Sequence, residues 1–250
     1  MIGVVAGVGP YAGLDLLNKI LSQTVAGRDQ DHLTVASISQ PDQIPDRTAF
    51  LLGQSPTNPA FAVLEQLLKL EQIGAQVAGI PCNTAHAPAI FDEIQRGLNA
   101  AGSKLTLLHM IAEVGHELRR SFPSISKVGV LSTTGTAVSR IYPRSLEPLG
   151  FELLAPDEKL QMEVIHPAIY DPVYGIKAHG KATAKARNNL MLGAQQLQEA
   201  GAQAIILGCT EIPLAIPEKH IETMPIIDPA LILARALITA VNPEKLRHNM

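Results

Sequence analysis

The two cysteines of this 250-residue chain, Cys82 and Cys209, stand in matching surroundings 127 positions apart. Each one follows a short apolar run and precedes a segment with helical patterning, in the sequences IPCNTAH (80–86) and LGCTEIP (207–213). A thiol at the amino end of a helix lies near unpaired backbone N–H groups and a partial positive charge, which lower its pKa. We therefore interpret both cysteines as reactive thiols; burial as ordinary core residues is the alternative.

Two thiols on opposite walls of a site suit proton exchange at a carbon atom. Racemisation at an α-carbon needs a base on one face of the substrate and an acid on the other. A thiolate can remove the proton while the opposing thiol delivers one. Such acid–base action contributes about 10²–10⁴-fold, and the remainder must come from positioning and from stabilisation of the carbanion. Cys82 and Cys209 are the candidate catalytic pair.

An internal repeat at half the chain length supports this pairing. The triplet GAQ at 74–76 recurs at 201–203, and each copy leads into an apolar run that ends at a cysteine. The sequence IGVV at 2–5 is echoed by VGVL at 128–131. We expect two α/β domains related by a pseudo-twofold axis, with the active site in the cleft between them. The expected domains are residues 1–110 plus 211–250, and residues 111–210.

Short apolar runs alternate with longer helical segments, which is typical of parallel sheets covered by helices. Two polar, turn-rich connections, at 40–58 and 172–180, are long for loops and are therefore candidates to carry function. The expected strands are Ile2–Ala6, Leu33–Ile38, Val77–Ile80, Leu105–Leu108, Lys127–Leu131, Phe151–Leu154, Ala204–Leu207 and Met224–Ile227. The expected helices are Tyr11–Thr24, Pro59–Ile73, Thr84–Ala101, Ile111–Arg120, Ala137–Pro148, Ala182–Ala200 and Pro229–Val241.

The segments PCNTAH (81–86) and GCTEIPL (208–214) resemble the aspartate/glutamate racemase family, and the resemblance covers nearly the whole chain. The sequences GVGP at 7–10 and IPDRT at 44–48 are similar to the family's first turn and substrate loop. The resemblance implies an acidic amino acid as substrate, no pyridoxal phosphate or other cofactor, and a homodimer. It also implies that Arg47, and similarly Lys177, binds a substrate carboxylate. A guanidinium suits that role because its planar fork can hold a carboxylate bidentately.

Other polar residues beside the cysteines, or in turns after strands, are candidate substrate contacts. Glu211 could accept from a substrate ammonium or tune Cys209, and His86 could orient or polarise Cys82. The alternative for most of the threonines and for Asn83 is capping of a helix. The full set of further substrate-binding candidates is Gly9, Asn83, Thr84, Thr133, Thr136, Thr210 and Glu211.

Two other enzyme classes compete with a racemase. The first turn, GVGPYA at 7–12, fits the dinucleotide-binding pattern G-x-G-x-x-A. Against it, the second strand ends in SQP at 39–41 without the carboxylate that binds a ribose, and Pro10 lacks a backbone donor. A related isomerase or decarboxylase of a small diacid could use the same thiols. A binding protein that has lost activity is a third reading.

Composition excludes several partners. The formal net charge is −3 and basic residues do not cluster, which argues against nucleic acid. Apolar runs fall short of the roughly 20 residues that a membrane span needs. The absence of Cys-x-x-Cys and His-x-x-x-His pairs argues against zinc. Two cysteines and no recognisable export signal indicate the cytoplasm.

Overall fold

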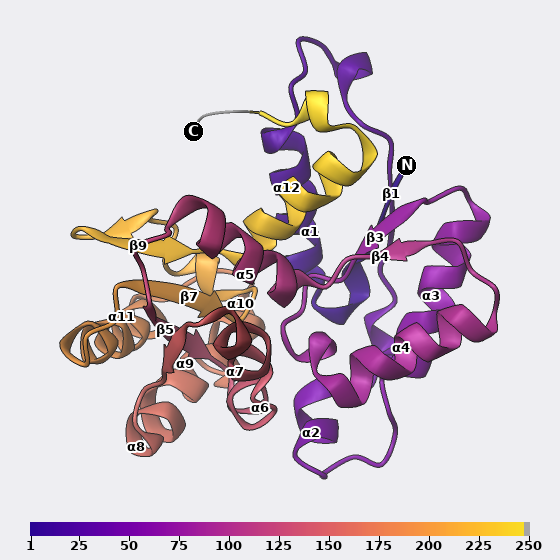
Figure 1. Ribbon diagram of the computed structural model, residues 1–250. Helices are drawn as coiled ribbons and strands as arrows, with labels where there is room; N and C mark the ends of the chain where they lie inside the picture. Colours follow the sequence, from indigo (N-terminus) through magenta and orange to yellow (C-terminus); the bar gives the residue numbers. More distant parts are fainter. Residues whose placement is uncertain (248–250) are drawn as a thin grey trace. The chain divides into compact units, whose positions relative to one another are not determined.

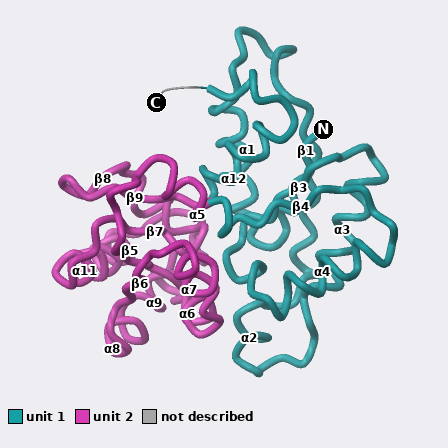
Figure 2. Tube along the Cα trace, in the orientation of Figure 1, with its two compact units in different colours: residues 1–113, 230–250 teal, residues 114–229 magenta. Residues whose placement is uncertain are grey.

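The computed structural model describes residues 1–247 and shows two compact units. Unit 1 contains residues 1–113 and 230–247, and unit 2 contains residues 114–229 (Figure 2). The chain returns to unit 1 after residue 229, and not after residue 210 as expected from the sequence. The reason is that the strand at Met224–Ile227 pairs with Ala204–Gly208 and so completes the sheet of unit 2.

Unit 1 contains a parallel four-stranded sheet in the order β2-β1-β3-β4. The central strands β1 and β3 are wholly buried, which explains their continuous apolar sequences. The strands are β1 (Ile2–Val5), β2 (Val35–Ile38), β3 (Val77–Gly79) and β4 (Thr106–Leu107).

Helices cover both faces of this sheet (Figure 1). A Cβ at Gly3 would lie 3.3 Å from Leu70 of α3 (Ala60–Gln72). A Cβ at Gly79 would lie 2.9 Å from Leu237 of α12 (Pro229–Val241). The missing side chains therefore let one helix pack closely on each face. The other long helices of unit 1 are α1 (Pro10–Gln23) and α4 (Pro88–Ala100), and α4 contacts α3.

Unit 2 contains a sheet in the order β6-β5-β7-β9-β8, in which only the pairing of β8 with β9 is antiparallel. The orders of β2-β1-β3-β4 and β6-β5-β7-β9 are the same, so the units repeat one topology, as the sequence repeat predicts. The strands are β5 (Lys127–Ser132), β6 (Glu152–Leu154), β7 (Ala204–Gly208), β8 (His220–Ile221) and β9 (Met224–Ile227). The predicted α/β class, with parallel sheets covered by helices, is confirmed.

Long and short helices complete unit 2. In α11 (Ala184–Glu199), Leu197 would lie 3.0 Å from a Cβ at Gly129, so this helix packs directly on β5. The helix α5 (Met110–Ser121) spans the boundary between the units. The shorter helices are α6 (Thr134–Val138), α7 (Ile141–Leu146), α8 (Glu158–Leu160), a π-helical turn (Gln161–Ile165), α9 (His166–Tyr170) and α10 (Ile176–His179).

Two predicted helices are broken. In place of Thr84–Ala101 there is a 3-10 turn (Thr84–His86) followed by α4, because Ala87 is extended (ψ 139°) before Pro88. In place of Ala137–Pro148 there are α6 and α7, separated by Arg140 in the left-handed region (φ 51°). Across residues 1–247, every helix is too short or too polar to cross a membrane.

Candidate active site

The first candidate acid–base thiol, Cys82, lies just beyond the carboxyl end of β3. Its backbone N–H donates to the Ile80 carbonyl at 2.8 Å, and this tight turn around Pro81 presents the side chain directly after the strand. Cys82 Sγ lies 3.2 Å from Thr84 Oγ1. A hydroxyl at this distance can donate to a thiolate, and the predicted contact of Thr84 with the substrate stays a prediction.

His86 supports the loop that carries Cys82, but its hydrogen bond is to the backbone of that residue. His86 Nδ1 lies 2.8 Å from the Cys82 carbonyl oxygen. Its ring stacks on Phe91 at 5.2 Å and meets the edge of His109 at 4.9 Å. Burial, with a contribution from His109, lowers the pKa of His86 to about 3. The ring is therefore neutral, and its Nδ1–H donates to the carbonyl and fixes the loop.

Arg47 is brought to the same edge of the unit 1 sheet by a short helix that the sequence did not predict. This helix, α2 (Arg47–Leu51), begins at Asp46, whose carboxylate accepts from the Ala49 N–H at 2.7 Å. The Arg47 guanidinium donates to the carbonyl of Val8 at 2.5 Å, at the end of the 3-10 turn that follows β1. Because α2 also contacts the turn Thr84–His86, Arg47 and the Cys82 loop converge at the carboxyl edge.

The glycines of the first turn serve close packing. A Cβ at Gly7 would lie 2.5 Å from the backbone nitrogen of Gln40, and one at Gly13 would lie 2.4 Å from Ala6. Gly9 is extended (φ −153°), and its carbonyl accepts from the Gly13 N–H at 2.8 Å. The space beside Gly7, the first glycine of the dinucleotide pattern, is therefore occupied by the protein's own backbone. This favours a structural role for Gly7.

The second candidate acid–base thiol, Cys209, directly follows β7 and has an acidic partner. Cys209 Sγ donates to Glu211 Oε2 at 3.0 Å, and Thr210 Oγ1 donates to the same oxygen at 3.4 Å. The other oxygen, Glu211 Oε1, forms an ion pair with Lys177 Nζ. The Glu211 side chain is 5% exposed and the Lys177 side chain 27%, so the pair is shielded from water on one side. Three residues predicted from the sequence, Lys177, Thr210 and Glu211, thus lie in one network with Cys209.

The charges in this network shift one another's titration. Burial raises the pKa of Cys209, and the Glu211 carboxylate raises it further. Burial alone would raise the pKa of Glu211, but Lys177 and the hydrogen bonds outweigh it and lower that pKa. Burial disfavours the charged form of Lys177, yet Glu211 and Cys209 outweigh that penalty and raise its pKa. At neutral pH the network therefore holds a thiol, a carboxylate and an ammonium group.

An aromatic pair holds the segment that carries Lys177, and the sequence analysis did not identify it. Lys177 Nζ lies 5.5 Å from the centre of the Tyr170 ring, and His166 stacks on that ring at 4.8 Å. His166 Nδ1 lies 3.0 Å from Thr134 Oγ1, which links α9 to α6. The spacing of four residues between His166 and Tyr170 was the available signal, since such pairs share one helix face.

The remaining predicted contacts lie near the two cysteines but act in part as structural groups. Thr133 caps α6 by accepting from the Thr136 N–H at 3.3 Å, and the two hydroxyl oxygens lie 3.1 Å apart. Asn83 is buried and occupies the position before the turn Thr84–His86, where its carbonyl accepts from the His86 N–H at 3.0 Å. Both turns follow carboxyl ends of strands, where α/β sheets bind ligands.

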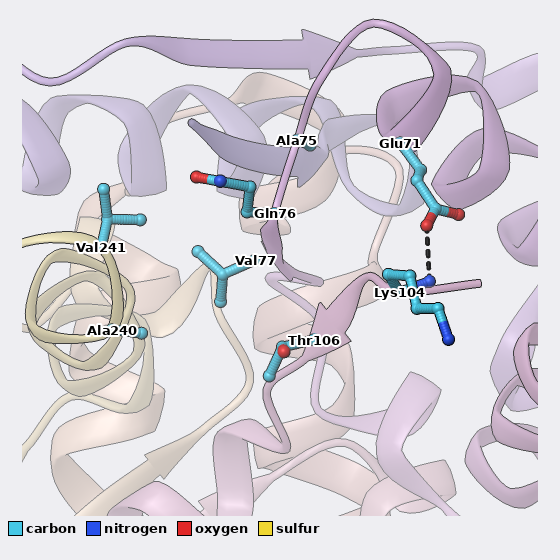
Figure 3. A pocket seen from close by; sticks show the side chains of 8 residues that line it. All are labelled: Glu71, Ala75, Gln76, Val77, Lys104, Thr106, Ala240 and Val241. Carbon is cyan, nitrogen blue, oxygen red and sulfur yellow. Dashed lines mark hydrogen bonds between the residues drawn. The ribbon is translucent and has the colours of Figure 1, made fainter.

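Among the described residues, each unit has a cavity away from the two sulfur atoms or beside a strand-end turn. One of about 590 Å³ is lined by Glu71, Gln76, Val77, Lys104 and Thr106, and Glu71 Oε1 accepts from the Lys104 N–H at 2.6 Å (Figure 3). Val77 and Thr106 begin their strands, so this cavity is at the end opposite Cys82. A second, of about 230 Å³ in unit 2, is lined by residues that include Ser132, Thr136, Arg140 and Tyr142. It adjoins the turn after β5.

Comparisons with known proteins show similarity to amino-acid racemases in sequence and in fold. The chain is 27% identical over 250 residues to the broad specificity amino-acid racemase RacX of Bacillus subtilis (strain 168), covering 96% of this chain and 97% of that protein. The structure resembles Picrophilus torridus aspartate racemase with a TM-score of 0.80 and 29% identity, over 99% of this chain and 95% of that one. Francisella tularensis glutamate racemase, solved with D-glutamate, shares the fold (TM-score 0.66, 17% identity, 100% and 83% covered).

The sequence profile of the Asp/Glu/Hydantoin racemase family matches residues 5–237, which is nearly the whole chain. The resemblance seen in the cysteine motifs is therefore confirmed. The chain belongs to the Asp/Glu/hydantoin racemase family and is an isomerase of the amino-acid racemase type.

Proposed function

We propose that the protein racemises acidic amino acids, aspartate or glutamate or both, without pyridoxal phosphate, with Cys82 and Cys209 as the two acid–base groups. The observation that carries the proposal is the equivalence of the two thiols. Cys82 follows β3 and Cys209 follows β7, and these strands hold the same place in the two sheets. A reaction between mirror-image substrates suits a pair of similar groups contributed by two copies of one unit.

In the proposed reaction, the substrate α-carbon lies between the two sulfur atoms. One sulfur, as a thiolate, takes the α-proton, and the other, as a thiol, donates a proton to the opposite face of the carbanion. The hydroxyl of Thr84 supports the anionic form of Cys82, since it lies 3.2 Å from Sγ. The products are the mirror-image amino acid and a swapped pair of protonation states, so the next substrate of opposite hand restores the first state.

Two positively charged side chains favour an acidic amino acid as the substrate. Arg47 lies at the carboxyl edge of unit 1, and Lys177 lies beside Cys209 in unit 2. An acidic amino acid carries two carboxylates, so one cation for each is a sufficient set. Because RacX bears the description broad specificity, we include neutral amino acids as competing substrates in the test. A homodimer remains a prediction, which light scattering of the purified protein would check.

The test is isotope exchange in deuterated water with purified protein and no added cofactor. We expect L-aspartate or L-glutamate to yield the D-enantiomer with deuterium at the α-carbon, analysed by chiral chromatography and mass spectrometry. Cys82→Ser and Cys209→Ser should each abolish racemisation, while Ser124→Ala, an exposed change, should not. Full racemisation by both serine variants would overturn the proposal. Loss of carbon dioxide or a double-bond shift in a diacid would instead identify the related decarboxylase or isomerase.

A further inference from the structure

The two thiols have hydrogen-bond partners of different chemistry. Cys82 Sγ lies 3.2 Å from a hydroxyl, Thr84 Oγ1. Cys209 Sγ lies 3.0 Å from a carboxylate oxygen, Glu211 Oε2. A hydroxyl can donate to a thiolate or accept from a thiol, whereas an ionised carboxylate can only accept. The pseudo-symmetry of the strands therefore ends at the side chains beside the sulfur atoms.

We propose that Glu211, locked in its anionic form by Lys177, keeps Cys209 protonated in the resting enzyme, so that Cys209 enters the reaction as the proton donor. This inference rests on the proposed two-thiol racemisation and assigns a direction to it. Glu211 and Lys177 act through Cys209 and are positioning residues in this role.

The hydrogen bonds around the Glu211 carboxylate indicate that it is ionised. Oε1 is engaged by the Lys177 ammonium, and Oε2 accepts from Cys209 Sγ and Thr210 Oγ1. Each of these contacts delivers a hydrogen to the carboxylate, so an ionised Glu211 satisfies all of them. A thiolate at the position of Cys209 Sγ would instead place a second negative charge 3.0 Å from Oε2, in a site where the Glu211 side chain is only 5% exposed.

Titratable groups approach Cys209 from three helices as well as from its own turn. Tyr142 of α7 is fully buried, and both burial and Cys209 raise its pKa; Asp228 adds to that shift. Lys177 of α10 is the cation of the network, and Tyr170 of α9 lies beneath it. Lys177 attracts a thiolate, whereas burial and the directly bonded Glu211 oppose one and prevail.

With Cys209 protonated in the resting enzyme, the first proton transfers have a defined direction. During the first turnover the Cys209 S–H bond breaks and a C–H bond forms on the substrate, while the opposite thiolate accepts the α-proton. Cys209 is then a thiolate beside the Glu211 carboxylate, which makes it a strong base. It regains a proton from a substrate of the opposite hand or from water. On acidification, kcat/KM should therefore begin to fall at a higher pH for the enantiomer that Cys209 deprotonates than for the other enantiomer.

The test measures ionisation of Cys209 and needs no turnover. In a Cys82→Ser background, Cys209 is the remaining cysteine, so its thiolate ultraviolet absorbance can be titrated against pH after subtraction of a Cys82→Ser, Cys209→Ser control. The rate of alkylation by iodoacetamide is a second readout. Adding Glu211→Gln should move the midpoint to lower pH by about one unit, which means about tenfold more thiolate at neutral pH. Adding Lys177→Met should move it to higher pH.

Matched controls separate this effect from a general change in charge. Glu218→Gln removes a carboxylate that pairs with Arg187, and Lys185→Met removes a lysine that lies 3.9 Å from the centre of the Tyr174 ring. Both should leave the midpoint in place. An unchanged or raised midpoint in the folded Glu211→Gln variant would overturn the inference. If that variant does not fold, Glu211→Ala, which also removes the carboxylate, is titrated in its place, and an unchanged or raised midpoint there overturns the inference. Absence of racemase activity with the predicted shifts would refute the proposed function and leave this inference standing.

Discussion

Arg47 illustrates how one side chain can have both a structural and a binding role. Its guanidinium donates to two backbone carbonyls, Val8 at 2.5 Å and Pro45 at 3.2 Å. These bonds hold the charged group beside the turn after β1, where a carboxylate of the substrate could meet it. The sequence indicated the residue through the resemblance of its loop to a known family. The short helix that places it had no periodic signal, because α2 spans only Arg47–Leu51.

Replacement of Arg47 should weaken substrate binding more than it slows chemistry. We expect Arg47→Ala to raise KM about 10- to 100-fold, since hydrogen bonds to charged groups are worth about 1.5–3 kcal/mol. Arg47→Lys should recover only part of this loss, because an ammonium lacks the fork. Steady-state kinetics with aspartate and glutamate would measure both effects. Arg28→Ala, in an exposed arginine that pairs with Asp31, is the control, and an unchanged KM in Arg47→Ala would contradict the assignment.

The lowered pKa of the buried His86 should make the stability of the protein depend on pH. Its pKa is about 3 in the folded chain, against about 6.5 for an unfolded histidine, so below pH 6.5 the unfolded state binds the proton more readily. The free energy of unfolding should therefore fall as pH decreases from about 6.5 to about 3, by up to about 1.4 kcal/mol per pH unit from this residue. Urea unfolding at several pH values would measure the slope.

The control for this pH effect compares two histidine variants. In His86→Asn the amide can still donate to the Cys82 carbonyl, but it cannot titrate, so the slope above pH 5 should be smaller than in the parent. His220→Gln, at an exposed position, should leave the slope unchanged. Equal slopes in the parent and in His86→Asn would mean that another group carries the proton uptake.

At the scale of elements, the sequence predicts the strands and long helices well where periodicity is continuous. The strand at Met224–Ile227 and the helix at Pro229–Val241 have the predicted bounds. The failures lie where one residue overrides the pattern. Pro88 forces an extended residue before it, and Arg140 adopts a left-handed conformation that propensity does not reveal. The short elements that carry Arg47 and Lys177 were predicted as loops, since helices of four or five residues show too little periodicity.

The first turn offers a test of packing at this scale. Gly7→Ala would place a Cβ 2.5 Å from the Gln40 backbone, so β1 and the chain after β2 would have to separate. We expect a loss of about 1–3 kcal/mol in the free energy of unfolding, as for other overpacked sites. Gly27→Ala, whose Cβ would approach no atom closer than 3.6 Å, is the matched control and should cost little. Equal urea midpoints for the two variants would refute this explanation of the glycine pattern.

At the scale of the whole molecule, the repeat in the sequence predicted two units with one strand order, and the structure confirms it. The boundary at residues 229 and 230 could not be placed in the same way. Between Cys209 and α12 lie a short turn and the small strands β8 and β9, and the prediction of a strand does not show which sheet that strand joins. Pairing of β9 with β7 decides the boundary, and that pairing is a long-range choice.

The helix α12 should stabilise unit 1 selectively. Leu237 is fully buried and packs against Gly79 of β3, so Leu237→Ala removes core volume from that unit. We expect a loss of about 2–5 kcal/mol and faster hydrogen exchange of the amides of β1 and β3 than of those of β5 and β7. Leu192→Ala, at a half-exposed position of α11, is the control. Uniform loss of protection in both units would show that they unfold as one.

The return of the chain to unit 1 through α12 also has a consequence for biosynthesis. During translation, residues 1–113 leave the ribosome long before the helix that covers one face of their sheet, since all of residues 114–229 are made in between. Unit 2 is a continuous segment and can complete its core first. The nascent amino-terminal sheet must wait with Gly79 and its neighbours uncovered, so a chaperone that binds apolar surface would meet this half of the polypeptide and release it once Leu233 and Leu237 arrive.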